Sequence, residues 1–239
     1  MKRKALLIGN TSGLPGVKID INNLSTFLLS DKGGAWYSTE IEILLNPTKI
    51  ALLARIDQIR REQFDYSMVM YSGHGGQRRE TMLEINAKSE QIPESSLKNI
   101  SLRQVNIYDC CRCYLEPLAK AEDARMKIAA FTESAKSSIR VRYDTRMMQA
   151  IPQQSSLYSC SIGQASYDTP EGAVYLGNLI KSALRVEGQY KLLGVAHEES
   201  VRPTTQHSIN KGLGTQTPES NLPKCVTTQQ LIISINPFT

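Results

Sequence analysis

The stretch YSMVMYSGHGGQ, residues 66–77, joins a mainly apolar run to a histidine enclosed by glycines. The run at 66–72 is typical of a buried β-strand. Gly73, Gly75 and Gly76 allow close backbone approach and positive φ angles, which suit a side chain presented at the mouth of a site. A lone histidine in a flexible glycine turn is the alternative interpretation, so the rest of the chain must supply a chemical partner.

Strand-like apolar runs also occur at 4–9, 41–45 and 104–109, and apolar residues recur at helical spacing over 17–29 and 48–61. The order strand, helix, strand, helix, strand predicts a parallel sheet with right-handed crossovers. We therefore expect an α/β protein in which helices flank both faces of a mostly parallel central sheet.

The second half of the chain is less regular. Residues 156–162 and 229–235 are predicted strands, and 172–186 is a predicted amphipathic helix. Residues 134–154 combine basic side chains with little periodicity and a proline, which predicts an exposed loop. Residues 197–227 are polar and rich in Thr, Ser, Pro and Gly, which predicts a long loop.

Length and composition exclude several classes of protein. A chain of 239 residues fits one domain spanning 1–239. The net charge of +5 is scattered among acids without aromatic interleaving, which argues against a nucleic-acid partner. The odd cysteine count argues against a disulfide framework and indicates a reduced, cytoplasmic protein. The apolar run near the N-terminus is too short for a signal peptide or membrane span.

A second informative stretch, IYDCCRCYLE at 107–116, places three cysteines after a predicted strand. Cys110 and Cys111 are adjacent and no second pair follows, which argues against structural zinc. Cys110 and Cys113 have the spacing of a redox pair, so a thiol–disulfide or zinc protein remains an alternative. A nucleophilic cysteine is the other interpretation. His74 could activate it, because the carboxyl ends of parallel strands open on one edge of a sheet.

Together these segments resemble the caspase-like cysteine peptidases, and within them the metacaspases and their bacterial relatives. FDYSMVMYSGHGGQ is close to the family's histidine motif and YDCCR matches its cysteine motif, while LPGVKIDINNLSTFL and SLYSCSIGQASYD are similar to flanking segments. The resemblance covers most of 4–185 and the last strand. It implies a caspase-like fold with a large-subunit-like part at about 1–133, a linker at 134–154 and a small-subunit-like part at 155–239.

By this resemblance Cys111 is the nucleophile and His74 the general acid and base. Gly75 and the backbone amide of Cys111 would form the oxyanion hole. No third triad member, metal or other cofactor is implied. A catalytically silent binding or scaffold module is the alternative, although silent relatives commonly lose the cysteine or the histidine.

The resemblance also implies a substrate class. Asp20 and Asp109 stand where metacaspases place the acidic floor of the primary specificity pocket, and Ser72 and Val17 match further pocket positions. Two buried carboxylates would bind a guanidinium or ammonium group, and bidentate geometry favours arginine. We expect protein substrates cut after Arg or Lys, an activating protein partner, and a role in bacterial stress, cell death or defence. Otherwise Asp20 would be a helix-start carboxylate and Asp109 a turn residue.

Self-cleavage in the 134–154 segment is a further hypothesis. Lys136, Arg140, Arg142 and Arg146 would suit an enzyme that cuts after basic residues. A solvated loop without such a role is the alternative.

Two departures from the metacaspase pattern are visible. Metacaspases usually continue the cysteine motif with His-Ser-Gly, whereas here Arg112-Cys113-Tyr114 follows, nearer to the Cys-Arg of caspases. The stretch 78–96 stands where many metacaspases carry an aspartate-rich calcium insertion, yet it holds no aspartate. Because hard cations need several carboxylates in close array, we expect no tight calcium requirement. The acids of this stretch are Glu80, Glu84, Glu90 and Glu94.

Overall fold

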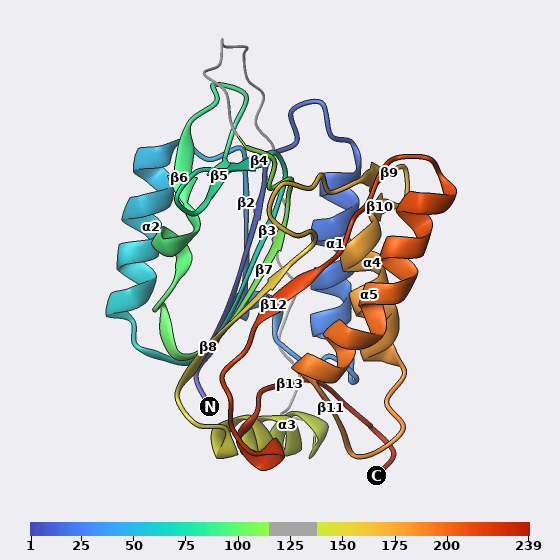
Figure 1. The fold of residues 1–239 in the computed structure, drawn as a ribbon. Coiled ribbons are helices and arrows are strands. Elements are labelled where there is room, and N and C mark those ends of the chain that lie inside the picture. Colours follow the sequence, from blue (N-terminus) through green and yellow to red (C-terminus); the bar gives the residue numbers. More distant parts are fainter. Residues whose placement is uncertain (115–137) are drawn as a thin grey trace.

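The computed structural model describes residues 1–114 and 138–239. Its centre is a six-stranded sheet of order β12-β8-β7-β3-β1-β2 (Figure 1). Neighbouring strands are parallel except for the antiparallel pair of β12 and β8. The strands are β1 (Arg3–Gly9), β2 (Ile41–Leu45), β3 (Phe64–Ser72), β7 (Ser101–Asp109), β8 (Gln153–Tyr158) and β12 (Glu219–Asn221).

Helices cover both faces of this sheet (Figure 1). α1 (Gly16–Leu29), α4 (Val174–Leu184) and α5 (Leu193–Asn210) lie on one face, α2 (Lys49–Arg61) lies on the other, and α3 (Ser138–Gln149) lies at the lower end of the sheet in the figure. The expected α/β architecture is confirmed.

Strand β3 shows how the sequence builds these layers. Its side chains alternate between the faces, as the pleat requires. Met68 and Met70 pack in the apolar cluster that includes α1 and α4 residues. Val69 and Tyr71 pack in the cluster that includes the buried face of α2. A strand buried on both faces reads as a continuous apolar run, which is why the sequence revealed it.

Smaller elements surround the main sheet. β4 (Gly75–Gln77), β5 (Thr81–Glu84) and β6 (Gln91–Pro93) form a three-stranded antiparallel sheet. β9 (Asp168–Thr169) pairs with β10 (Gly172–Ala173), and β11 (Tyr190–Leu192) pairs with β13 (Ile232–Ile235). The short 3-10 helices are η1 (Ser38–Glu40), η2 (Glu94–Leu97) and η3 (Thr227–Gln229). Strands this short carry too few residues for a periodic pattern.

The long loop expected over 197–227 is wrong. α5 extends to Asn210 and β12 then adds a strand to the main sheet. The inward face of α5 carries Ser200, Thr204 and Ser208, which are fully buried. Their hydroxyls donate to backbone carbonyls three or four residues earlier in the chain, so this polar face needs no other partner. The buried side of α5 is therefore largely polar, and the sequence shows no apolar stripe that would have predicted this helix.

The exposed loop expected over 134–154 is also wrong in its described part. Residues 138–149 form α3, and Arg140 and Arg146 are buried in the fold. Arg140 donates to the carbonyl of Ala35 and to the Glu40 carboxylate. Arg146 donates to the carbonyls of Thr227 and Gln230. Basic composition indicated a solvated segment, but these buried guanidinium groups serve as hydrogen-bond donors to backbone carbonyls and to the Glu40 carboxylate.

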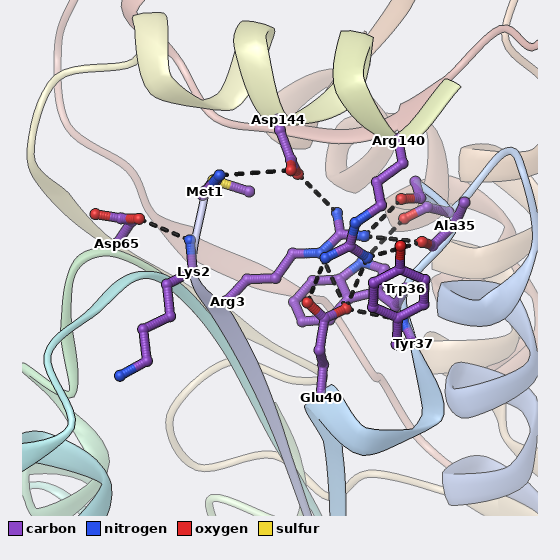
Figure 2. Close-up of polar contacts among 12 residues, drawn as sticks. Met1, Lys2, Arg3, Ala35, Trp36, Tyr37, Glu40, Asp65, Arg140 and Asp144 are labelled. Carbon is purple, nitrogen blue, oxygen red and sulfur yellow. Dashed lines mark hydrogen bonds and ion pairs between the residues drawn. The ribbon is translucent and has the colours of Figure 1, made fainter. Parts of the chain in front are cut away.

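Arg3 connects α3 to the start of β1 (Figure 2). Its buried guanidinium donates to the carbonyls of Gly34 and Ala35 at 2.8 and 2.9 Å. It also forms ion pairs with Glu40 at 3.3 Å and with Asp144 of α3 at 3.1 Å. Five donors in a planar fork allow one arginine to satisfy this many acceptors.

The change Arg3→Met is expected to lower the free energy of unfolding by about 3 kcal/mol, because it takes one buried guanidinium away from two carboxylates and two carbonyls. Urea unfolding of both proteins measures the difference. Arg61→Met, the same substitution at an exposed position, is the matched control and should stay within about 0.5 kcal/mol of wild type. A cost for Arg3→Met no larger than that of the control would contradict the structural role of the cluster.

Candidate active site

His74 lies between β3 and β4, at the carboxyl edge of the main sheet. Its Nε2 atom is 2.7 Å from the carbonyl oxygen of Ser12. Because a carbonyl can only accept, Nε2 carries the hydrogen, and Nδ1 of the neutral ring is left as an acceptor. The carbonyl of His74 itself accepts from the Tyr71 hydroxyl at 2.6 Å and the Glu84 amide at 3.0 Å. Ring and backbone are thus both fixed, with Nδ1 available as a base.

The glycines around His74 bring the two motifs into contact. A Cβ atom on Gly73 would lie 2.7 Å from the Tyr71 hydroxyl, and its φ of 154° is rare for other residues. A Cβ atom on Gly75 would lie 2.8 Å from Cys110 Sγ. The Gly73 amide also donates to the carbonyl of Asp109 at 3.1 Å. The close backbone approach indicated by the glycines is therefore present where the ends of β3 and β7 meet.

The cysteines after β7 differ in their surroundings. Cys110 is buried beneath Gly75, Cys113 is exposed, and Cys111 is half-buried. The Cys111 Sγ atom accepts from the Ser166 amide at 3.4 Å and lies 3.6 Å from the Ser166 carbonyl. Burial raises the pKa of the Cys111 thiol, and the Ser166 amide partly offsets this. Within residues 1–114 and 138–239, no hydrogen bond joins Cys111 to His74.

A narrow cavity beside Cys111 brings together the four expected pocket residues, Val17, Asp20, Ser72 and Asp109. All four are buried. The two carboxyl groups are held by separate sets of donors. Asp20 accepts from the Ser72 hydroxyl at 2.6 Å and the Ala173 amide at 2.7 Å. Asp109 accepts from the Ser166 hydroxyl at 2.7 Å and the Leu176 amide at 3.1 Å.

A third carboxyl group, which the sequence did not reveal, lines the same cavity. Asp168 begins β9, and its Oδ2 atom accepts from the Gly16 amide at 3.0 Å. Its Oδ1 atom is buried and has no hydrogen-bond partner in the described part of the chain. A two-residue strand gives no pattern that would mark this aspartate in advance.

Burial and neighbouring negative charge raise the proton affinity of Asp20 and Asp109. Burial, followed by the negative charge of Asp109, raises the pKa of Asp20 to about 7. Burial raises the pKa of Asp109 to about 6, and the charge of Asp168 adds to this. Hydrogen bonds from Ser72, Ser166 and backbone amides act in the opposite direction. Such a cavity holds several negative charges only at a cost, which a bound cation would remove.

Arg112, the residue after Cys111, holds the loop in place. Its guanidinium donates to the Glu219 carboxylate at 2.8 Å and to the Thr81 hydroxyl at 3.2 Å. It also lies 4.2 Å from the centre of the Tyr158 ring. One buried side chain thereby links the cysteine loop to β5, β8 and β12, in place of the His-Ser-Gly continuation of metacaspases.

Comparison with known proteins now decides the family. The family model of the caspase domain matches residues 2–221. The chain belongs to the caspase domain family. Among solved structures, this caspase-domain protein is similar to caspase-1 from Spodoptera frugiperda, with 14% sequence identity and a TM-score of 0.59, over 92% of this chain and 86% of that chain. No curated protein sequence matches it.

The family is one of cysteine peptidases, so this caspase-domain protein has a hydrolase domain that acts on proteins. The expected caspase-like fold is confirmed, whereas the metacaspase subtype and the division near residue 133 stay predictions. In the described residues, no group of three or more His, Cys, Asp or Glu side chains is placed to hold a metal ion. Within the same ranges, no helix has the length and apolar character needed to cross a membrane.

Proposed function

We propose that this caspase-domain protein is a cysteine endopeptidase that cleaves protein substrates after arginine or lysine. The observation that carries the proposal is the cavity beside Cys111, which is lined by the carboxyl groups of Asp20, Asp109 and Asp168. A guanidinium or ammonium group entering it would neutralise charge that is otherwise desolvated. The test is hydrolysis of fluorogenic peptides that differ only in the residue before the scissile bond, Arg, Lys or Asp. Turnover of the Asp peptide alone would contradict the proposal.

In the proposed reaction Nδ1 of His74 accepts the Cys111 proton and Sγ attacks the substrate carbonyl carbon. Because burial raises the pKa of the thiol, a base is needed at neutral pH. The amides of Gly75 and Cys111 are proposed to stabilise the negative charge that develops on the carbonyl oxygen. His74 then protonates the leaving amine, and water hydrolyses the thioester. The Ser12 carbonyl would keep the His74 imidazole in the required tautomer. It would also accept a stronger hydrogen bond from the imidazolium that forms when His74 takes up the proton.

The pH dependence of turnover should report the pocket. The raised pKa values of Asp20 and Asp109 mean that both carboxyl groups are largely neutral in acid and bind a cation weakly there. We expect KM for an arginine peptide to fall as pH rises from about 5 to 8. Rates of Cys111 alkylation by iodoacetamide over the same range serve as control, since they report the thiol and His74 but no bound arginine. A flat KM would contradict ionisation of the pocket in this range.

Calcium is not expected to activate the enzyme. Three of the four acids of the 78–96 stretch bind separate partners: Glu80 accepts from the Ser95 amide, Glu90 from Asn86 and the Lys49 amide, and Glu94 from Lys98. Initial rates should be equal in chelator and in millimolar calcium. A large activation from zero would contradict this expectation.

Self-cleavage in the 134–154 segment stays a prediction, although the structure places three of the expected cleavage positions in a helix. Lys136 lies outside the described residues, while Arg140, Arg142 and Arg146 belong to α3. Peptidases bind their substrates extended, so cutting after these three arginines would first require α3 to unfold. Intact mass after prolonged incubation, compared between wild type and Cys111→Ala, tests the idea. An activating partner and a cytoplasmic location also stay predictions.

A further inference from the structure

Gln216 lies between α5 and β12, in the stretch that the sequence indicated to be a loop. Its side chain is fully buried, although Thr215 and Thr217 flank it in the sequence. α5 fixes its backbone, because the Gln216 amide donates to the Ser208 hydroxyl at 3.1 Å and its carbonyl accepts from the Thr205 hydroxyl at 2.8 Å. The helix thereby places the side-chain amide of Gln216 next to Ser166, behind the cavity beside Cys111.

The hydrogen bonds of this side chain have a fixed direction. Nε2 of Gln216 lies 3.0 Å from the Ser159 carbonyl, which can only accept, so the NH₂ group must face it. The same NH₂ group lies 3.1 Å from the Ser166 hydroxyl. That hydroxyl accepts from Gln216, and its own hydrogen is left for the Asp109 carboxylate at 2.7 Å. A chain of donors therefore runs from Gln216 through Ser166 to the floor of the cavity.

Ser166 acts on two groups at once. Its hydroxyl binds Asp109, and its backbone amide is 3.4 Å from the Cys111 sulfur. Whatever holds Ser166 therefore sets the charge of the pocket floor and the environment of the thiol together. We propose that Gln216 is a positioning residue, which holds Ser166 where it can bind the Asp109 carboxylate and the Cys111 thiol simultaneously. This inference rests on the proposed function of the same site.

Gln216→Leu removes both donors at similar volume. We expect kcat/KM for an arginine peptide to fall about tenfold, mainly through KM, because one buried hydrogen bond behind the pocket floor is lost. Ser166 is then no longer held in place to donate to Asp109, so the charged form of this carboxyl group is less favoured and the acid limb of the KM profile should move to higher pH. The midpoint of Cys111 alkylation by iodoacetamide, followed by peptide mass, should also move to higher pH as Ser166 is released.

The matched control is Gln206→Leu, the same substitution at an exposed glutamine of α5, whose side-chain amide donates to Asn210. It should move neither pH profile. Gln216→Leu should also add little in a Ser166→Ala background, because Gln216 acts through the Ser166 hydroxyl. Should Gln216→Leu fail to fold, Gln216→Met, which keeps the length of the side chain, takes its place.

The two proposals fail in different ways. If the wild-type protein cleaves no Arg or Lys peptide, the proposed function is wrong. Alkylation of Cys111 needs no turnover, so the pH midpoint of alkylation still tests the role of Gln216 in that case. Unchanged pH profiles in the Gln216 variant, or an equal loss with and without Ser166→Ala, would overturn the positioning role.

Discussion

Cys111→Ala is expected to lower the turnover of an arginine peptide by about 10⁴-fold or more, because it removes the proposed nucleophile while leaving His74 and the pocket in place. The neighbouring cysteines provide matched controls. Cys110 is buried beneath Gly75 and Cys113 is exposed, and neither belongs to the proposed machinery. Cys110→Ala and Cys113→Ser should therefore retain turnover within a few-fold of wild type. The measurement is kcat/KM for all four proteins on one peptide, with active sites titrated.

This set of variants separates the three interpretations of the sequence. A thiol–disulfide protein using Cys110 and Cys113 would depend on those residues and not on Cys111. A silent scaffold would show no turnover in any variant, and Cys111→Ala would then change nothing. Loss in Cys111→Ala alone supports the peptidase, whereas equal loss in Cys113→Ser would contradict the assignment of the nucleophile.

The sequence indicated the central sheet because its inner strands β1, β3 and β7 are buried on both faces over most of their length. A strand buried on both faces, such as β3, can be recognised as a continuous apolar run. When such strands are parallel, their carboxyl ends lie at the same edge of the sheet. His74 and Cys111 could be placed at that edge before any coordinates were known. The pairing of β12 with β8 could not be predicted, since an antiparallel edge strand of three polar residues leaves no hydrophobic signal.

The residues missed at the site share a physical reason. Ser12 contributes a backbone carbonyl, which no side-chain pattern marks. Ser166 acts partly through its amide, and the backbone of Gln216 is held by hydroxyls of α5, which leave no apolar pattern. Asp168 stands on a strand too short to recognise. Buried polar groups look like solvent-exposed ones in a sequence, as the arginines of α3 also do.

Asp20→Asn is expected to lower kcat/KM for an arginine peptide by about 10²- to 10³-fold, because one partner of a buried charge pair is lost. Most of the loss should fall on KM. Alkylation of Cys111 should keep its rate, since the thiol contacts Ser166 and not Asp20. Retained arginine turnover in this variant would contradict the assignment of the pocket.

The same substitution should make the protein more stable in mild alkali. Burial raises the pKa of Asp20 to about 7, so between its unfolded value and neutrality the folded state binds more protons than the unfolded state. The free energy of unfolding therefore falls as pH rises through this window, and the cost of the buried charge is fully present above it. Asn carries no such charge. We expect Asp20→Asn to gain about 2 kcal/mol over wild type at about pH 8 and little at about pH 4.

Urea unfolding at both pH values measures this gain. Asp57→Asn, at an exposed aspartate paired with Arg60 on the surface of α2, is the matched control and should be neutral at both. An equal gain for Asp20→Asn at acid and alkaline pH would mean that charge is not its cause. A gain confined to alkaline pH, together with lost arginine turnover, would identify Asp20 as a carboxylate retained for substrate binding at the expense of stability, since the fold alone would favour a neutral residue there.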